Sequence, residues 1–178
     1  MGTLKTTNIQ TITGSGTLTL GTSGETLALG SSVTSNLMYP AFMATQNASQ
    51  SVANNTQTKL QLQSKSWDTD SAFDNTTNYR FTIPSGKAGK YVFFYAIRFD
   101  TLGDGDIFQI QNYKNGTLEN RSRQISTMGI ADNGVIRAQF ADDGSVGDYY
   151  EVYVQHNYGS NRSTNLAFSN FVGYRIGS

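Results

Sequence analysis

The sequence lacks cysteine, has only two prolines and carries few charges, and each shortage excludes a class of protein. Without cysteine there is no disulfide, thiolate metal site or thiol nucleophile. Charged residues make up 15% of the chain and its formal net charge is zero, so it lacks the positive surface that binds nucleic acid or anionic membranes. No run approaches the roughly 20 apolar residues of a membrane span, and residues 1–10 have no signal-peptide pattern. We expect a soluble protein with no nucleic-acid partner and no membrane insertion.

The familiar catalytic motifs are also missing. His156 is the sole histidine, and the chain has no Gly-x-Ser-x-Gly or His-Glu-x-x-His sequence, which argues against a serine hydrolase or a zinc enzyme. A glycoside hydrolase needs only two facing carboxylates, but the sequence singles out no pair. We therefore predict that the chain is not an enzyme and has no cofactor, with a glycan hydrolase as the enzymatic alternative.

The chain is rich instead in glycine, aromatic residues, serine, threonine and asparagine, a composition typical of short strands joined by tight turns. From Leu37 onward, apolar runs recur at short intervals with turn residues between them, and no helical period is sustained. This pattern predicts an all-β sandwich or jelly roll. The expected strands are Tyr39–Ala44, Lys59–Gln63, Tyr79–Ile83, Tyr91–Phe99, Ile107–Gln111, Gln124–Ile130, Val135–Phe140, Tyr149–His156 and Leu166–Ile176.

Residues 1–36 contain a short repeat. Thr17–Gly21 reads Thr-Leu-Thr-Leu-Gly, and Thr26–Gly30 repeats it with one alanine. Two strands with two leucines each cannot form a core alone, so we expect identical segments of other chains to wind together with them. We predict a trimeric stem over residues 1–36 and a head over residues 37–178, the alternative for the first segment being a disordered leader. The stem residues expected at the trimer interface are Leu18, Leu20, Leu27 and Leu29.

The run Tyr91–Phe99 is apolar on both faces of the expected strand. One face of an antiparallel sandwich is normally solvated, so a strand with two apolar faces indicates a second buried surface. A subunit interface is the simplest such surface, and a covering loop of the same chain is the alternative. Tyr149–His156 repeats the pattern. The head residues predicted at a trimer interface are Val92, Phe94, Tyr150 and Val152.

A series of short motifs follows in a fixed order between Tyr39 and Ile176. They are Pro40–Ala44, Phe73–Asp74, Tyr79–Pro84, Gly86, Gly89–Phe93, Asn112–Gly116, Gly147–Val154, Phe168–Phe171 and Gly173–Tyr174. In order and spacing they resemble the complement C1q and tumour necrosis factor superfamily. The resemblance implies a ten-stranded antiparallel jelly-roll sandwich that assembles as a compact homotrimer.

The matching residues are structural ones. The resemblance implies that Gly89 permits a close approach, that Pro84 lies at an edge or turn, and that the core contains Phe81, Phe93 and Phe171. The binding chemistry of the family lies in variable loops, so no functional residue carries over. The chain departs from the family pattern in one extra residue before Pro84, with Asn78 near the usual glycine, and in having the leucine repeat where animal relatives have a collagen stalk.

Two features suggest ligand sites. Asp100, Asp104 and Asp106 place three carboxylates in one loop, which is compatible with calcium, although the spacing falls short of an EF-hand and ordinary use of Asp and Gly in a turn is the alternative. Trp67, the lone tryptophan, lies in an expected loop and is a candidate for stacking on a sugar ring. Its alternative is burial beneath that loop.

These inferences lead to one functional hypothesis and one alternative. The leucine-repeat leader is similar to segments that precede the heads of bacteriophage and other viral fibre or decoration proteins. We therefore expect a homotrimeric virion protein, a fibre or capsid-decoration head, assembled in the host cytoplasm. Its stem would contact other virion proteins, and its loops would bind a host surface glycan or receptor. The alternative is a secreted or surface-displayed bacterial adhesin or carbohydrate-binding module of the same fold.

Overall fold

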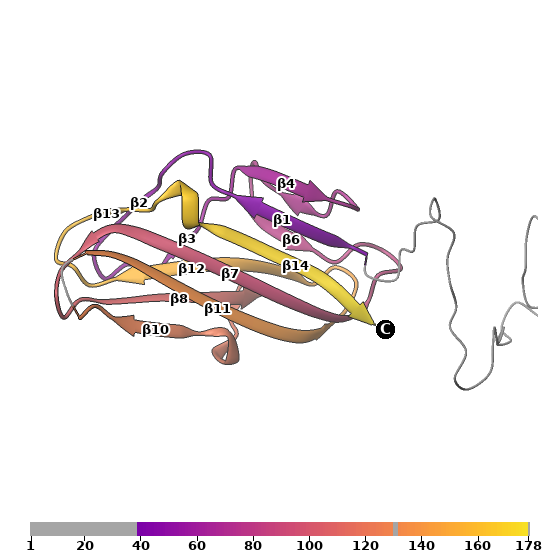
Figure 1. The fold of residues 1–178 in the computed structure, drawn as a ribbon. Coiled ribbons are helices and arrows are strands. Elements are labelled where there is room, and N and C mark those ends of the chain that lie inside the picture. The colour runs from indigo at the N-terminus through magenta and orange to yellow at the C-terminus, as the bar shows by residue number, and fades with distance from the viewer. Residues whose placement is uncertain (1–38, 130–131, 178) are drawn as a thin grey trace, which may run out of the picture. The chain divides into compact units, whose positions relative to one another are not determined.

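The computed structural model describes residues 39–129 and 132–177, and the predicted stem, with its four leucines, lies outside them. The described part is built almost entirely from antiparallel strands in two main sheets (Figure 1). Among the described residues, no helix has the length and hydropathy of a membrane span.

The first sheet has five strands in the order β11-β7-β14-β1-β4. Long strands at its centre belong to the segments that the sequence marked as most apolar. The strands are β1 (Ala41–Thr45), β4 (Ser64–Asp68), β7 (Gly89–Leu102), β11 (Asp132–Gly144) and β14 (Asn170–Gly177).

The second sheet has the order β10-β8-β12-β6-β5. It contains β5 (Phe73–Asp74), β6 (Arg80–Thr82), β8 (Ile107–Lys114), β10 (Gln124–Thr127) and β12 (Tyr149–His156). Short strands extend it or form a separate pair, and two single-turn 3-10 helices connect strands. These are β2 (Ser51–Val52), β3 (Thr58–Lys59), β9 (Thr117–Leu118), β13 (Arg162–Ser163), η1 (Asn120–Ser122) and η2 (Leu166–Phe168).

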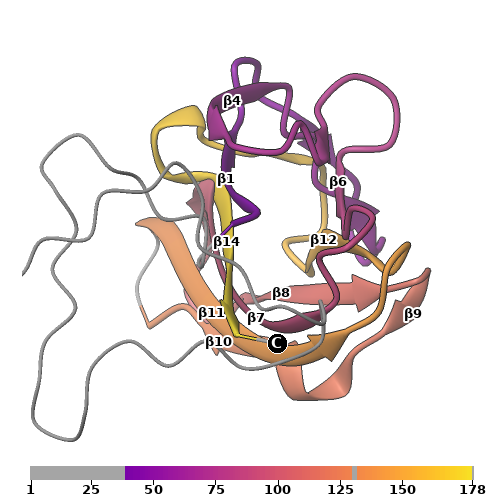
Figure 2. The same cartoon turned by 90° about the vertical axis from the view of Figure 1, so that its right-hand side faces the viewer.

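The chain passes repeatedly from one sheet to the other. After β6 in the second sheet it forms β7 in the first, β8 and β10 in the second, β11 in the first, β12 in the second and β14 in the first. Figure 2 shows the two sheets facing each other around the core. The predicted jelly-roll sandwich is confirmed. Over the described residues it has fourteen strands, five of them only two residues long, where ten strands were expected.

Aromatic rings fill the space between the sheets. Phe42 stacks on Phe81 with ring centroids 4.6 Å apart and meets Phe171 edge-on at 4.9 Å, and Phe93 lies 4.4 Å from Tyr150. All five side chains are fully buried. The core positions expected for Phe81, Phe93 and Phe171 are therefore confirmed, and burial of these aromatic rings stabilises the sandwich.

Three local expectations were wrong. Ser64–Asp68 forms β4 instead of a loop, because it pairs with β1 at the border of the sheet. Leu60 and Leu62 are fully buried, but the regular strand there is only β3. The expected strand beginning at Leu166 starts with η2, and β14 follows it.

Asp74 organises the turn between β5 and β6. Its carboxylate accepts hydrogen bonds from the backbone N–H groups of Thr76, Thr77 and Asn78 and from the Asn78 amide. The bonds from Thr77 and Thr76, aided by Asn78 and opposed by partial burial, hold the pKa of Asp74 well below its usual range. One side chain thus provides the hydrogen-bond partners for a turn that leads into the core strand β6.

Candidate functional site: an apolar sheet face

The five-stranded sheet has one side against the core and the other side open. Along β7, Phe93 and Tyr95 are buried, whereas Phe94 between them is 38% exposed and Val92 is half-buried. Successive residues of a strand point to opposite faces, so Val92 and Phe94 lie on the open side. β7 therefore carries large apolar side chains on both of its faces.

The register of the sheet aligns further apolar side chains with Phe94. Residues directly opposite one another in an antiparallel ladder share a face. Phe94 lies opposite Val172 of β14, and Val172 lies opposite Met43 of β1. Met43 in turn lies opposite Trp67 of β4. One row of apolar side chains therefore crosses four neighbouring strands.

A second row runs beside the first. Tyr174 of β14 lies opposite Val92, and Val92 lies opposite Ala141 of β11. The Phe94 and Tyr174 rings stack across the two rows with centroids 6.1 Å apart. We call the outward residues of both rows the apolar sheet face. Its members are Met43, Trp67, Val92, Phe94, Ala141, Val172 and Tyr174.

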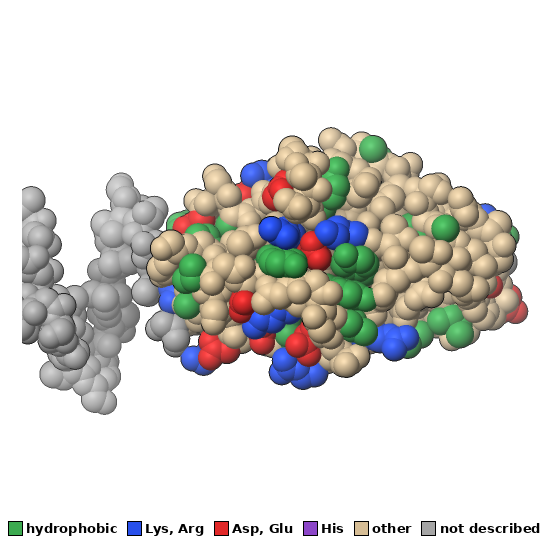
Figure 3. Space-filling view, turned by 180° about the vertical axis from the view of Figure 1, so that it is seen from behind, with side chains coloured by type: hydrophobic (Ala, Val, Ile, Leu, Met, Phe, Trp, Pro, Cys, Tyr) green, Lys and Arg blue, Asp and Glu red, His purple; other side chains and the backbone are tan. Residues whose placement is uncertain are grey.

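The outward side of the seven-stranded sheet has a different character. Viewed from behind, it shows hydrophobic side chains interspersed with acidic and basic ones (Figure 3). On β12, Glu151 bonds to Lys59 at 2.5 Å, and the guanidinium of Arg80 lies 4.1 Å from the Tyr149 ring centre. This side therefore mixes paired charges with single exposed apolar side chains such as Ile107 and Ile125, and it differs from the aligned apolar rows of the other sheet.

The predicted interface residues fall into two groups. Val92 and Phe94 lie on the apolar sheet face, and their role in an interface stays a prediction. The assignment of Tyr150 and Val152 was wrong, because they are 0% and 1% exposed within a single chain. Both point into the core from β12, where Tyr150 pairs with Phe81 of β6. Their burial leaves no side-chain surface for a second subunit.

The predicted calcium ligands are not brought together. Asp100 accepts a hydrogen bond from Asn165 at 2.9 Å, Asp106 accepts the backbone N–H of Gly103, and Asp104 is exposed. Within residues 39–129 and 132–177 no group of three or more His, Cys, Asp or Glu side chains could hold a metal ion. The turn interpretation of Asp106 fits this geometry, since its own N–H donates to Gly103.

Trp67 lies in strand β4 and not in a loop. It is 41% exposed, so the alternative of burial beneath a loop was wrong. The indole lies at the β4 end of the apolar sheet face, and sugar binding by this ring stays a prediction.

His156 is not available as a general base. It is 1% exposed, its Nε2 lies 3.0 Å from the Val52 carbonyl, and its Nδ1 accepts the backbone N–H of Tyr158. Both ring nitrogens are thus bound to the backbone, and the ring packs against Phe99 at 5.1 Å. The one histidine of the sequence has a structural role.

A charged network closes the end of the sandwich near Lys114. Its ammonium lies 2.6 Å from Asp142 and 3.0 Å from Asp148, and the buried Tyr150 hydroxyl donates to Asp142. Burial alone would lower the pKa of Lys114, but the bonds to the two carboxylates outweigh it and raise the pKa. Burial, reinforced by the bond to Asp142, raises the pKa of Tyr150. These groups hold one another and present no free acid or base.

Sequence reasoning missed most of the apolar sheet face. Val172, Tyr174 and Met43 were not assigned to an interface, although alternation in the last strand places Val172 and Tyr174 on one side. Three arginines that line one pocket beside β11, Arg121, Arg123 and Arg137, were also missed. Their spacing in the sequence has no pattern that could have identified them.

Comparison with known proteins bears on the fold. No protein-family model and no curated protein matches the sequence. Among solved structures, Eiger TNF from S. frugiperda is similar with a TM-score of 0.56 and 12% identity, over 78% of this chain and 92% of that one. Murine APRIL is similar with a TM-score of 0.57 and 12% identity, over 76% of this chain and 98% of that one. The globular domain of zebrafish complement 1qA is similar with a TM-score of 0.52 and 16% identity, over 77% of this chain and 97% of that one. The described residues thus have the fold of these TNF and C1q globular domains.

Proposed function

We propose that the chain is a non-enzymatic module that assembles as a homotrimer through the apolar sheet face. The observation that carries this proposal is the pair of aligned apolar rows on the open side of the five-stranded sheet, with Phe94 38% exposed and Trp67 41% exposed. A contiguous apolar surface of this kind is typical of an interaction site, and identical chains would cover it by closed symmetry. The fold shared with TNF and C1q domains favours three copies.

The larger role that we propose is display. A trimeric head carries three copies of each surface loop, so that weak contacts add by avidity. Together with the leucine repeat of residues 17–30, this favours a fibre or capsid-decoration protein of a virion, assembled in the host cytoplasm, that contacts other virion proteins through its N-terminal segment. Its head would bind a glycan or receptor on the host surface. Capsid or tail genes beside its own gene would support this role.

A surface-displayed bacterial adhesin or carbohydrate-binding module is the second candidate. The exposed Trp67 favours it, because indole rings on a surface stack well on sugar rings. An export signal on the full precursor and an absence of capsid genes nearby would favour this candidate over the virion.

The decisive experiment is the native mass of the full chain by light scattering on a sizing column. We expect three times the 19.4 kDa of one chain. A Phe94→Glu variant, which places a charge in the middle of the apolar sheet face, should elute as a folded monomer, whereas Arg80→Gln on the opposite sheet should stay trimeric. A wild-type monomer at all concentrations would refute the trimer.

A further inference from the structure

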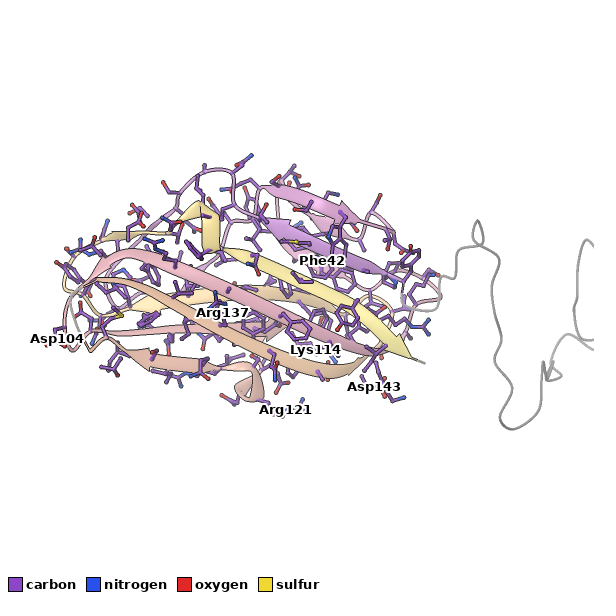
Figure 4. The ribbon with its side chains drawn as sticks, in the orientation of Figure 1. Phe42, Asp104, Lys114, Arg121, Arg137 and Asp143 are labelled. Carbon is purple, nitrogen blue, oxygen red and sulfur yellow. The ribbon has the colours of Figure 1, made fainter. Side chains whose placement is uncertain are left out.

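A pocket of about 490 Å³ lies at the border of the sandwich. It is formed by β11 and β7 of the first sheet together with η1 and the start of β10 of the second sheet. Three arginines line it. Arg121 belongs to η1, Arg123 follows it directly, and Arg137 comes from β11 (Figure 4 labels Arg121 and Arg137). No aspartate or glutamate lines the pocket.

The charges of the pocket are not balanced. The side chain of Arg137 makes no hydrogen bond or ion pair with any described residue. Arg123 donates from Nε and Nη2 to the Oε1 of Gln109, at 3.0 and 2.7 Å, and that partner is neutral. Arg121 is paired with Glu119 at 2.9 Å. Gln109 lines a neighbouring pocket, so the Arg123 guanidinium is bound there, and Arg137 is left as the arginine of the 490 Å³ pocket whose side chain has no partner among the described residues.

The remaining walls suit a ligand larger than a simple anion. Phe94, Tyr95 and Ala96 supply an apolar wall, and Gln139 and Asn170 supply amide groups. The volume falls within the range of small-molecule sites, which combine an apolar lining with a few polar groups that orient the ligand. Guanidinium groups bind carboxylates in a planar two-bond geometry, and amides bind hydroxyl groups. The lining thus offers partners for a charge, for hydroxyls and for a ring.

We propose that this pocket binds an acidic sugar residue. Its carboxylate would bind Arg137, and its hydroxyls would bind Gln139 and Asn170. All of these residues come from one chain. Phe94, which also lines the pocket, belongs to the apolar sheet face and would be covered there by a neighbouring copy in the proposed trimer. The pocket lies at the β11 border of the apolar sheet face, where Arg137 begins the polar row that follows the apolar ones.

The test is calorimetric titration of the full chain with glucuronate and with N-acetylneuraminate. Galactose tests the need for the charge, and sodium sulfate at equal ionic strength tests the need for the sugar. We expect both acidic sugars, or one of them, to bind at least tenfold more tightly than galactose and sulfate. Arg137→Gln should weaken that binding about tenfold or more, because a charge-assisted pair is lost.

Arg80→Gln is the matched control. It removes one positive charge from β6, which does not line the pocket, so the net charge changes equally in both variants. We expect its affinity to equal that of the wild type. The side chain of Arg137 is exposed and has no partner among the described residues, so the Arg137→Gln chain should fold, and a thermal melt verifies it.

Several results would overturn the proposal. Equal binding of inorganic sulfate would leave a simple anion site, and equal losses in both variants would indicate long-range attraction alone. Binding by none of the probes would refute the site. If acidic sugars bind only in samples that light scattering shows to be monomeric, a neighbouring copy fills the pocket in the assembly. A monomer that binds acidic sugars would instead refute the trimer and leave this site standing.

Discussion

Two neighbouring phenylalanines on β7 allow the core and the proposed interface to be tested separately. Phe93 is fully buried and its ring lies 4.4 Å from that of Tyr150, whereas Phe94 is 38% exposed on the opposite face. Phe93→Ala should lower the free energy of unfolding by about 3–5 kcal/mol, the usual cost of removing a buried phenyl ring. Phe94→Ala should leave a dissociated chain nearly as stable as before.

The effect of Phe94→Ala on assembly follows from the area that remains exposed. A phenylalanine side chain offers roughly 200 Å², so 38% exposure leaves about 75 Å² to be covered by a neighbour. At about 25 cal/mol per Å² this is about 2 kcal/mol per copy and about 6 kcal/mol per trimer. Each 1.4 kcal/mol is tenfold, so the association constant should fall by about four decades. The association constant of a trimer has units of inverse concentration squared. The protein concentration at which half of the trimer dissociates should therefore rise by the square root of that change, about a hundredfold.

The assay is sedimentation velocity over a dilution series, combined with urea unfolding of each variant at low concentration. The expected pattern is a crossed one, in which Phe93→Ala loses stability and Phe94→Ala loses assembly. Identical dissociation curves for Phe94→Ala and the wild type would show that the apolar sheet face does not hold the subunits together. Equal unfolding costs for the two variants would show that Phe94 belongs to the core.

Three further outcomes are expected. Gly173→Ala should cost about 1–3 kcal/mol in urea unfolding, because an added Cβ would lie 2.6 Å from ring atoms of Phe42 and Phe93. Asp74→Asn should lower the free energy of unfolding by about 1–2 kcal/mol at pH 7. The pKa of Asp74 is lower in the folded chain than in the unfolded chain, so this stability is present above the unfolded pKa of about 4 and is lost as the pH falls below it. The stability curves of variant and wild type should therefore converge in acid. Acrylamide should quench Trp67 fluorescence more strongly after dilution to monomer; quenching that does not depend on concentration would place Trp67 outside the interface.

The sequence predicted the strands best where apolar residues alternate over a long run. The bounds expected for Tyr149–His156 are those of β12, and Tyr91–Phe99 lies inside β7. In such runs every second side chain is buried, so the alternation of apolar residues by itself predicts a strand. β4 has no such pattern, because Ser64–Asp68 is mostly polar and becomes a strand only by pairing with β1. Its place at the border of the sheet could not be found from local residues.

The same patterns could not say which face of a strand is buried. β12 carries tyrosines on both sides, and only the pairing of Tyr150 with Phe81 shows that Tyr150 points inward while Tyr153 points outward. Because side chains alternate with a period of two, choosing the wrong face reverses every assignment on the strand. The structure places Val92 and Phe94 on the open side of β7, and it places Tyr150 and Val152 on the core side of β12.

The arginine pocket and the apolar sheet face together suggest how copies would meet. β11 has thirteen residues and is the last strand of its sheet, so one side of its backbone has no ladder partner there. A long edge strand of this kind invites pairing with another chain, and charged side chains disfavour it. β11 carries Arg137 together with Asp142 and Asp143, so pairing along this edge would bring charged side chains of two copies together. Approach through the apolar sheet face leaves these charges in solvent and favours a closed assembly over an extended sheet.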